Sequence, residues 1–196
     1  MKKFSIASLI LFFVMVSPLA AQTVAAPAAV DSHAAALRQL ALPGVNHYIL
    51  DRLAGTWKIT GEAWLEGFDK KSAKVTGQAR HGTRFNSRFL SMDDSLNIRN
   101  AIYESAALLG YDNARKHYVM SRASSQSTAL VHYTGTADSS SKRLTLESSP
   151  ADSLAGTYAR ITIRFINGNK FVVETWDIYP NGTALKQREL IYTRLS

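Results

Sequence analysis

The chain has 196 residues, 46% of them hydrophobic and 19% charged, and a formal net charge of +8 at pH 7. This length suits one globular domain with a proper core. The sequence contains no cysteine, which excludes disulfide bonds, thiolate catalysis and attachment of a lipid to a cysteine.

Residues 1–21 have the pattern of a cleaved secretory signal peptide. Lys2 and Lys3 form a positive n-region, residues 4–16 are almost wholly apolar, and two alanines end the segment. The apolar run is too short for a membrane anchor. We therefore expect a periplasmic or secreted protein without a transmembrane segment in the mature chain, cut directly after these alanines or within 24–29.

A short lead-in follows this segment. Residues 22–45 have little bulk and predict a linker and then a short helix, capped by Ser32 and running through Leu42. A second short helix is predicted from Asn46, its cap, to Leu53. Because such short helices are unstable alone in water, the second is expected to pack across one end of the fold that follows.

From Gly55 onward, apolar residues alternate with polar ones, as in strands with one buried face. Asn167-Gly168 and Asn181-Gly182 favour tight hairpins, and no helical pattern separates the strands. About ten strands joined by short turns exclude a parallel sheet and leave an antiparallel barrel or a sandwich. Closure removes exposed edges, so we predict an all-β fold, a single up-and-down antiparallel β-barrel over residues 46–196. After the strand at Gly55, the expected strands are 72–85, 88–98, 101–112, 116–123, 127–137, 142–148, 157–166, 170–179 and 185–195.

Gly55 and Trp57 stand at the head of the first predicted strand, and Arg194 lies two residues from the end of the chain. This arrangement is similar to the signature of calycin barrels, in which a tryptophan plugs one end and a basic residue of the last strand lies across its ring. The similarity implies structural roles for Gly55, Trp57 and Arg194, with a cation–π contact between the last two.

Four blocks of sequence extend this likeness: Leu53-Ala54-Gly55-Thr56-Trp57, residues 88–90, residues 108–119 and Ile191-Tyr192-Thr193-Arg194. Together they resemble a bacterial family of calycin-like domains of unknown function, within the lipocalin-like and fatty-acid-binding-protein-like barrels. The resemblance covers residues 46–195. It implies a fold and leaves the activity open.

The sequence lacks the common motifs of catalysis and of phosphate or metal binding. It has no Gly-rich phosphate loop, no Gly-x-Ser-x-Gly elbow and no His-Glu-x-x-His. No two of its histidines have the i, i+2 spacing of ligands on one strand face, although His81 and His132 could meet across the barrel. Nitrobindin, a calycin branch, binds haem through a histidine on a late strand, and this chain has none after His132. We therefore expect no metal and no cofactor.

Positive charge gathers between residues 69 and 88, where only Asp69 opposes Lys70, Lys71, Lys74, Arg80, Arg84 and Arg88. Such a stretch can attract anionic headgroups or acidic polymers, but it more often forms a solvated sheet face. We interpret it as a solvated face and expect no nucleic-acid partner. The oligomeric state is left open.

Candidate binding residues come from strand parity, because alternate side chains share a face. If Trp57 and Arg194 face inward, Arg188, Leu190 and Tyr192 do so too. A ten-stranded barrel is wide enough to leave a cavity, and a guanidinium beside a phenol suits a ligand with an anionic head and an apolar body. Parity alone does not fix the face of the other candidates. The full set is Arg188, Tyr192, Trp176, Glu174, Glu104, His81 and His132, with no catalytic residue assigned.

The leading hypothesis is an exported, non-enzymatic barrel that binds a small apolar or amphipathic molecule, with its tail among residues such as Ile59, Leu130 and Leu190. One alternative is an isomerase or hydrolase of a lipid-like substrate, although no paired carboxylates or nucleophile–base pair are evident. The other is an envelope-associated interaction module that uses the basic segment 70–88. An open pocket with converging polar groups favours the first hypothesis. A carboxylate or histidine in that pocket with a strongly perturbed pKa favours the second, and a filled barrel favours the third.

Overall fold

The structure is a computed structural model that describes residues 27–65, 71–150 and 156–195. The chain divides into two compact units, Met1–Leu37 and Arg38–Ser196. The predicted signal peptide, residues 22–26, and Asp69 and Lys70 of the basic stretch lie outside the described residues. Over the described parts, no helix combines the length and the hydropathy needed to cross a bilayer.

Helix α1 spans Pro27–Leu40 and begins earlier than the sequence predicts. Residues 27–30, expected in a linker, form its first turn, and Ser32 lies within the helix rather than at its cap. Proline is well suited to the first helical position, and the alanines that follow have the highest helix propensity. The linker prediction was wrong here because little side-chain bulk does not argue against a helix.

The second predicted helix is divided in two. A 3₁₀ turn, η1, covers Val45–His47, and the α-helix α2 follows as Tyr48–Leu53. Asn46 lies inside the 3₁₀ turn and is not its cap. The extended Gly44 precedes the turn, and its backbone N–H donates to His47 Nδ1 at 3.0 Å. The apolar side chains of α2 are buried in the core of the barrel, as the prediction of a helix across one end requires.

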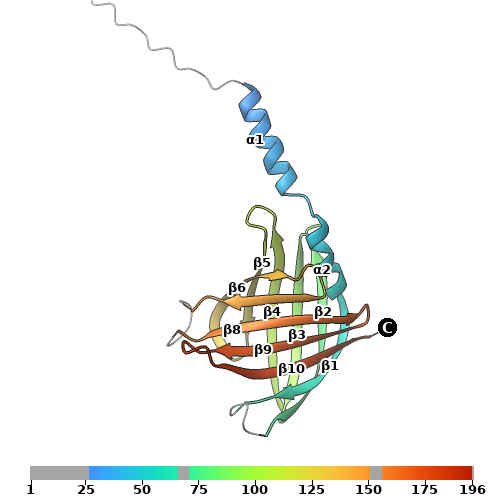
Figure 1. The fold of residues 1–196 in the computed structure, drawn as a ribbon. Coiled ribbons are helices and arrows are strands. Elements are labelled where there is room, and N and C mark those ends of the chain that lie inside the picture. The colour runs from blue at the N-terminus through green and yellow to red at the C-terminus, as the bar shows by residue number, and fades with distance from the viewer. Residues whose placement is uncertain (1–26, 66–70, 151–155, 196) are drawn as a thin grey trace, which may run out of the picture. The chain divides into compact units, whose positions relative to one another are not determined.

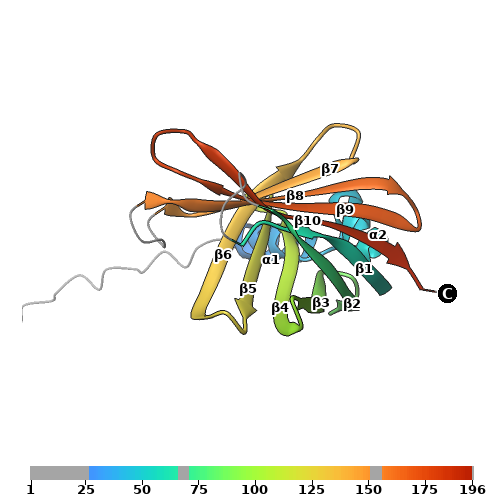
Figure 2. The same cartoon turned by 90° about the horizontal axis from the view of Figure 1, so that it is seen from below.

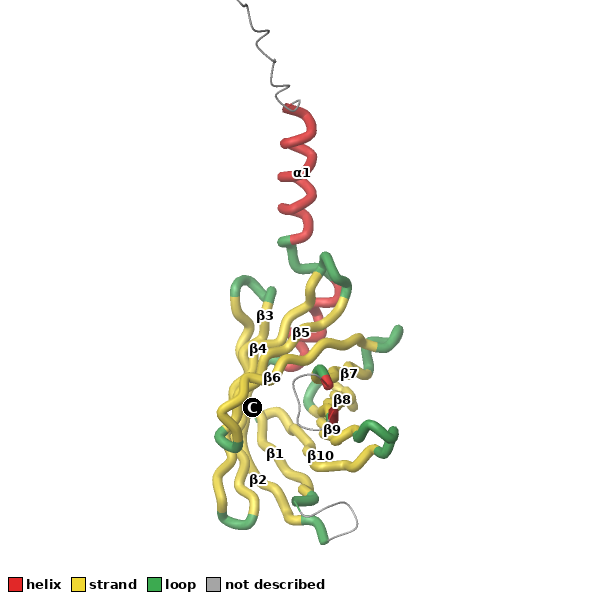
Figure 3. Tube along the Cα trace, turned by 90° about the vertical axis from the view of Figure 1, so that its left-hand side faces the viewer, coloured by secondary structure: helices red, strands yellow, loops and turns green. Residues whose placement is uncertain are grey.

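The barrel is closed, and each strand pairs antiparallel with its neighbours in the chain, while β1 pairs with β10 (Figure 1). Figure 2 shows β2, β3, β4 and β5 on one side and β7, β8 and β9 on the other, and Figure 3 shows the short loops that join them. The predicted all-β, up-and-down fold is confirmed. The strands are β1 (Gly55–Ala63), β2 (Ala73–Arg84), β3 (Phe89–Ile98), β4 (Ala101–Asp112), β5 (His117–Ser124), β6 (Ser127–Ala137), β7 (Arg143–Ser148), β8 (Tyr158–Asn167), β9 (Lys170–Ile178) and β10 (Ala184–Arg194).

The pairing of β1 with β10 defines two ends of the barrel. Trp57 is opposite Arg194 at the end that α2 covers, here called the helix end, and Ala63 is opposite Arg188 at the far end. Between them, a Cβ on Gly61 would overlap the backbone carbonyl oxygen of the facing strand β10. Glycine therefore lets the first and last strands approach closely enough to close the barrel.

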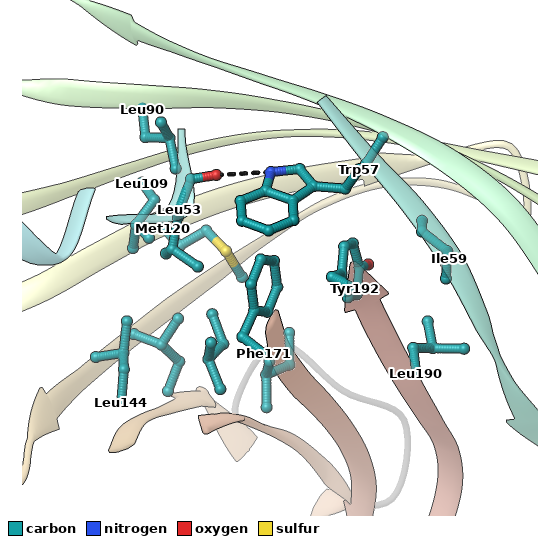
Figure 4. Packing of buried hydrophobic residues seen from close by; sticks show 14 of the residues in the cluster. Leu53, Trp57, Ile59, Leu90, Leu109, Met120, Leu144, Phe171, Leu190 and Tyr192 are labelled. Carbon is teal, nitrogen blue, oxygen red and sulfur yellow. Dashed lines mark hydrogen bonds between the residues drawn. The ribbon is translucent and has the colours of Figure 1, made fainter. Parts of the chain in front are cut away.

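Packed aromatic and apolar side chains fill the helix end (Figure 4). Trp57 is buried, and its Nε1 donates to the carbonyl oxygen of Leu53 at 3.0 Å. Phe171 meets the indole edge to face with ring centroids 4.7 Å apart, and it stacks on Tyr192 at 4.5 Å. Such aromatic pairs add stability beyond the area that they bury.

Arg194 completes this plug. Its guanidinium carbon lies 4.2 Å from the centre of the Trp57 ring, and its Nη1 donates to the carbonyl oxygen of Ala54 at 2.8 Å. Gly55 has φ 137°, and a Cβ there would overlap the guanidinium. The contact expected between Trp57 and Arg194 is therefore present, and Gly55 makes room for it.

Candidate functional site

Between its two ends the barrel encloses a cavity of about 50 Å³. Side chains from six strands, β3, β4, β5, β8, β9 and β10, form its walls. The apolar wall consists of Met92, Leu96, Ala107, Met120, Ile161, Ile163, Val173 and Leu190, and the polar wall of Asp94, Ser105, Arg122, Thr175, Arg188 and Tyr192. The cavity expected for a ten-stranded barrel exists, but it is small, and polar groups converge on it.

A buried hydrogen-bonded network joins this cavity to the helix end. His81 Nδ1 lies 3.1 Å from the carbonyl oxygen of Leu53, and its Nε2 lies 2.9 Å from Asp94 Oδ1. The hydroxyl of Tyr192 donates to the other carboxylate oxygen, Oδ2, at 2.7 Å. Burial, followed by the charge and hydrogen bond of Asp94, holds the pKa of Tyr192 well above its usual range, so the phenol keeps its proton.

The hydrogen bonds of Asp94 are complete within the wall of the cavity. His81 Nε2 lies at one carboxylate oxygen and the hydroxyl of Tyr192 at the other. The second ring nitrogen of His81 lies at the backbone carbonyl oxygen of Leu53. Asp94 is therefore already paired with its own neighbours.

Two guanidiniums lie on the far-end side of the cavity. Arg122 Nη2 donates to Ser105 Oγ at 3.2 Å. Burial, and then the positive charge of Arg122, lower the pKa of Arg188 below its usual range. This direction shows that the surroundings of Arg188 disfavour its positive charge.

Asp177 is the carboxylate that faces Arg188. Burial raises its pKa above the ordinary value, and the charge of Arg188 opposes that shift. Burial also raises the pKa of Tyr133, whose hydroxyl interacts with Arg122. Among the described residues around the cavity, Asp94 is paired with His81 and Tyr192, and Asp177 faces Arg188. The guanidinium of Arg122 is bonded to neutral hydroxyls, so the excess charge is positive.

Gln126, in the turn between β5 and β6, is the hydrogen-bond partner of Arg188 at the far end. Its Oε1 accepts a hydrogen bond from Arg188 Nη2 at 2.6 Å, and Gln126 itself is exposed. Arg188 therefore extends from the cavity to the surface at the far end, where it is held by a neutral amide oxygen.

The structure divides the residues predicted from the sequence between the two faces of the barrel. Arg188 and Tyr192 line the cavity, and the buried His81 reaches it through Asp94. Glu104 and His132 are exposed, and His132 bonds Ser121 on the neighbouring strand. The structure therefore does not bring His81 and His132 together across the barrel.

Glu174 and Trp176 lie on the opposite face of β9 from the cavity. Lys186 binds Glu174 at 2.8 Å and lies 4.9 Å from the centre of the Trp176 ring. Lys186 also binds Glu189, its neighbour on β10, at 2.6 Å. These contacts form an outer ion-pair cluster, separate from the cavity walls.

Four residues of the site were not singled out from the sequence, namely Asp94, Arg122, Asp177 and Gln126. Asp94 and Arg122 carried a signal, because each has the same parity as buried residues of its own strand. Asp177 carried none, because Val172 and Val173 leave the inner face of β9 open. Gln126 carried none, because it belongs to a turn. Within the described residues, no three His, Asp or Glu side chains gather closely enough to hold a metal ion.

These features define a class of protein: a closed, ten-stranded antiparallel barrel with a tryptophan–arginine plug and a small polar cavity. Residues 42–194 match the family described as "Protein of unknown function (DUF1579)". The match spans most of the chain, so the chain belongs to this family. A search of curated proteins finds no match.

Two solved structures share the fold. The crystal structure of Rv2717c from M. tuberculosis has a TM-score of 0.59 at 12% identity, covering 78% of this chain and 99% of that chain. The S-type phycobiliprotein lyase CPES from Guillardia theta has a TM-score of 0.53 at 10% identity, covering 81% of this chain and 97% of that chain. At such identities the likeness concerns the fold alone.

Proposed function

We propose that this chain is an exported, non-enzymatic barrel that binds a small amphipathic molecule, with the anionic head of that molecule at Arg188 and Arg122. The charge balance of the far end carries the proposal. Asp177 faces Arg188, whereas Arg122 is bonded to the neutral hydroxyls of Ser105 and Tyr133. Asp94 is already paired with His81 and Tyr192. An anion taken out of water needs charged or hydrogen-bonded partners, and this end supplies both.

The size of the cavity limits which part of a ligand it can take. Its volume of about 50 Å³ is far below the roughly 300–1,000 Å³ of pockets that enclose a whole drug-sized ligand. It suits a head group of a few atoms. Leu190 lines it, whereas Ile59 is packed in the core and Leu130 is 57% exposed. The tail prediction was therefore wrong for Leu130, and we expect the ligand body at the far end, beyond Arg188.

Gln126 is the group that a ligand head has to displace. Its amide oxygen holds the position on Arg188 that a carboxylate oxygen would take. Hydrogen bonds between two ionised groups are stronger than those to a neutral amide, so a carboxylate competes well for this position. Because Gln126 is an exposed turn residue, the exchange leaves the core closed.

The polar groups of the cavity support binding better than acid–base catalysis. Asp94 is bonded to both His81 and Tyr192, and both nitrogens of His81 are occupied. Neither group can exchange a proton with a ligand without losing a bond that it already makes. Asp177 has a raised pKa, but the charge that it faces is the guanidinium of Arg188. These contacts favour a binding protein over an isomerase or hydrolase.

A fluorescent fatty acid, dansyl-labelled at its tail, tests the proposal by titration. We expect saturable binding that Arg188→Leu weakens by about 2–5 kcal/mol, as the loss of a charged partner does. Gln126→Ala should tighten binding, because it removes the internal competitor. The matched control is Arg164→Leu, which removes an exposed cation of β8 and should change nothing. Equal binding by wild type and Arg188→Leu, or none by either, would contradict the proposal.

Export is tested separately by N-terminal sequencing of the protein from cell fractions. We expect a mature chain that starts between Gln22 and Val30 in the periplasm or the medium. Recovery of the chain from the cytoplasm with Met1 intact would contradict export, and it would leave the binding experiment unaffected.

A further inference from the structure

Exposed apolar side chains gather at the helix end of the barrel, on the outside. Leu42, Val45, Tyr48 and Phe85 are 52%, 74%, 68% and 70% exposed, respectively. We call these four side chains the apolar cap. Scattered exposed apolar residues need no explanation, but a group at one end marks an interaction site.

Hydrogen bonds hold the segments of the apolar cap together. Arg88 Nε donates to the carbonyl oxygen of Ala41 at 2.7 Å, and its Nη1 donates to that of Phe85 at 2.9 Å. Asn113 Nδ2 donates to the carbonyl oxygens of Leu40 and Leu42, both at 2.8 Å. The chain before η1 is thus fixed between the β2–β3 turn and the β4–β5 turn, and the cap is a built surface.

The backbone of the β2–β3 turn presents Phe85 to solvent at an energetic cost. Phe85, Asn86 and Ser87 have φ values of 52°, 55° and 58°, a run of three left-handed residues without a glycine. An aromatic residue is unfavourable in this conformation, whereas asparagine adopts it readily. The ring of Phe85 meets that of Phe89 edge to face with centroids 6.1 Å apart, and Phe85 is still 70% exposed.

Basic side chains flank the apolar cap. The segments 84–88 and 112–116 contain Arg84, Arg88, Arg115 and Lys116, and their one acid is Asp112. Asp112 already binds Arg115 at 2.9 Å, and hydrogen bonds from the backbone and side chain of Arg115 lower its pKa. Residues 40–48 contain no acid. Asp51 of α2 and Asp138, which lines a hollow with Val45, are further acids near the cap. The cations outnumber these acids, so the surroundings of the cap have a net positive charge.

We propose that the apolar cap docks the barrel on an anionic lipid bilayer. Exposed aromatic and aliphatic side chains insert at the boundary between headgroups and acyl chains, and basic residues around them are attracted to anionic headgroups. An acidic soluble polymer would use the cations but gain nothing from Phe85, Val45 and Leu42. The bilayer uses both. The proposal is independent of the cavity and gives a role to Arg84 and Arg88 of the basic stretch.

Co-sedimentation of the purified protein with vesicles tests the docking. We expect binding to vesicles that contain phosphatidylglycerol, much weaker binding to pure phosphatidylcholine, and release as NaCl rises to about 0.5 M. The double variant Phe85→Asn, Val45→Ser should bind at least about tenfold more weakly, because it removes inserted apolar groups. It should fold normally, since asparagine suits the left-handed backbone at position 85.

The matched control is Leu130→Ser, which removes an exposed leucine from the outer face of β6 and should leave vesicle binding unchanged. Sedimentation velocity without vesicles accompanies each variant. Equal vesicle binding by wild type and the double variant would overturn the proposal. A wild type that binds neither kind of vesicle would also overturn it. This holds even if sedimentation velocity shows that the wild type self-associates through the cap and that the double variant is monomeric.

Discussion

The two ends of the barrel interior are built from the same strands but differ in how their buried polar groups are partnered. At the helix end, Trp57 and His81 both bond the carbonyl oxygen of Leu53, and Arg194 bonds that of Ala54. At the far end, the charge of Arg122 disfavours that of Arg188, and the neutral Gln126 amide holds the guanidinium. Polar groups at the helix end are matched by fixed backbone partners, whereas the far end has an excess of positive charge, which the proposed ligand would balance.

Under the proposed function, one closed sheet separates stability from binding. Fully partnered polar groups in a packed region rigidify it, so the helix end holds the fold. Buried charges without matching partners cost stability, which is why we assign the far end to binding in the proposed function. Substitutions at the two ends should therefore have effects of opposite sign, and four predictions test this contrast.

The largest effect is expected at Trp57. Trp57→Ala should lower the free energy of unfolding by about 3–5 kcal/mol, because it opens a cavity against Phe171 and Arg194. Urea denaturation followed by circular dichroism measures the change. Trp176→Ala, on the outer face of β9, is the matched control and should cost about 1 kcal/mol at most. Equal losses in the two variants would remove the distinction between plug and surface.

Arg194→Ala should lower the free energy of unfolding by about 1–2 kcal/mol, through the lost cation–π contact and the lost bond to Ala54. Combined with Trp57→Ala in a double-mutant cycle, it should show coupling, since the two side chains are in contact. Strict additivity of the two losses would mean that the tryptophan and the arginine do not act as one plug.

At the far end, removal of a charged side chain should not lower the free energy of unfolding. Arg122→Met keeps the length of the side chain but removes the charge that disfavours Arg188, and it leaves Arg188 facing Asp177. The free energy of unfolding should stay the same or rise by about 1 kcal/mol, as replacement of buried charges often does. A loss comparable to that of Arg194→Ala would show that both ends are built alike.

The smallest effect is a pH dependence from Asp177, whose folded pKa lies above its ordinary value of 3.8. The folded protein therefore holds this proton more tightly than the unfolded chain does. The resulting stabilisation is fully present below the unfolded pKa and is lost as pH rises through the folded pKa. Unfolding measured at a series of pH values should show this decline in wild type, and Asp177→Asn should lack it. Parallel curves for the two proteins would exclude the assigned shift.

Strand parity predicted much of the fold and part of the candidate site from the sequence. The alternation after Gly55 is local, so the strands and the inward direction of Arg188 and Tyr192 could be predicted. The contact of Trp57 with Arg194 came from the resemblance to calycin barrels. Parity alone left open which face of β9 is inside, because Val172 and Val173 are adjacent apolar residues that support either reading.

Other parts of the site depend on contacts between distant segments. The Gln126 bond to Arg188 joins residues that are 62 positions apart, and that of Tyr192 to Asp94 joins residues 98 apart. No local pattern marks such partners. Asp94 and Arg122 could have been placed inside by parity, but their charges were not expected in a buried wall. The size of the cavity follows from packing and had no signal in the sequence.

The central claim is that the far end recognises negative charge, and calorimetric titration with octanoate and with octanol tests it most directly. The two molecules have similar apolar bodies and differ in the charge of the head. The account predicts that octanoate binds at least about tenfold more tightly to wild type, as charge-assisted hydrogen bonds allow, and that Arg188→Leu abolishes the difference. Equal affinities for the two molecules in wild type, or a preference for octanoate that survives Arg188→Leu, would contradict it.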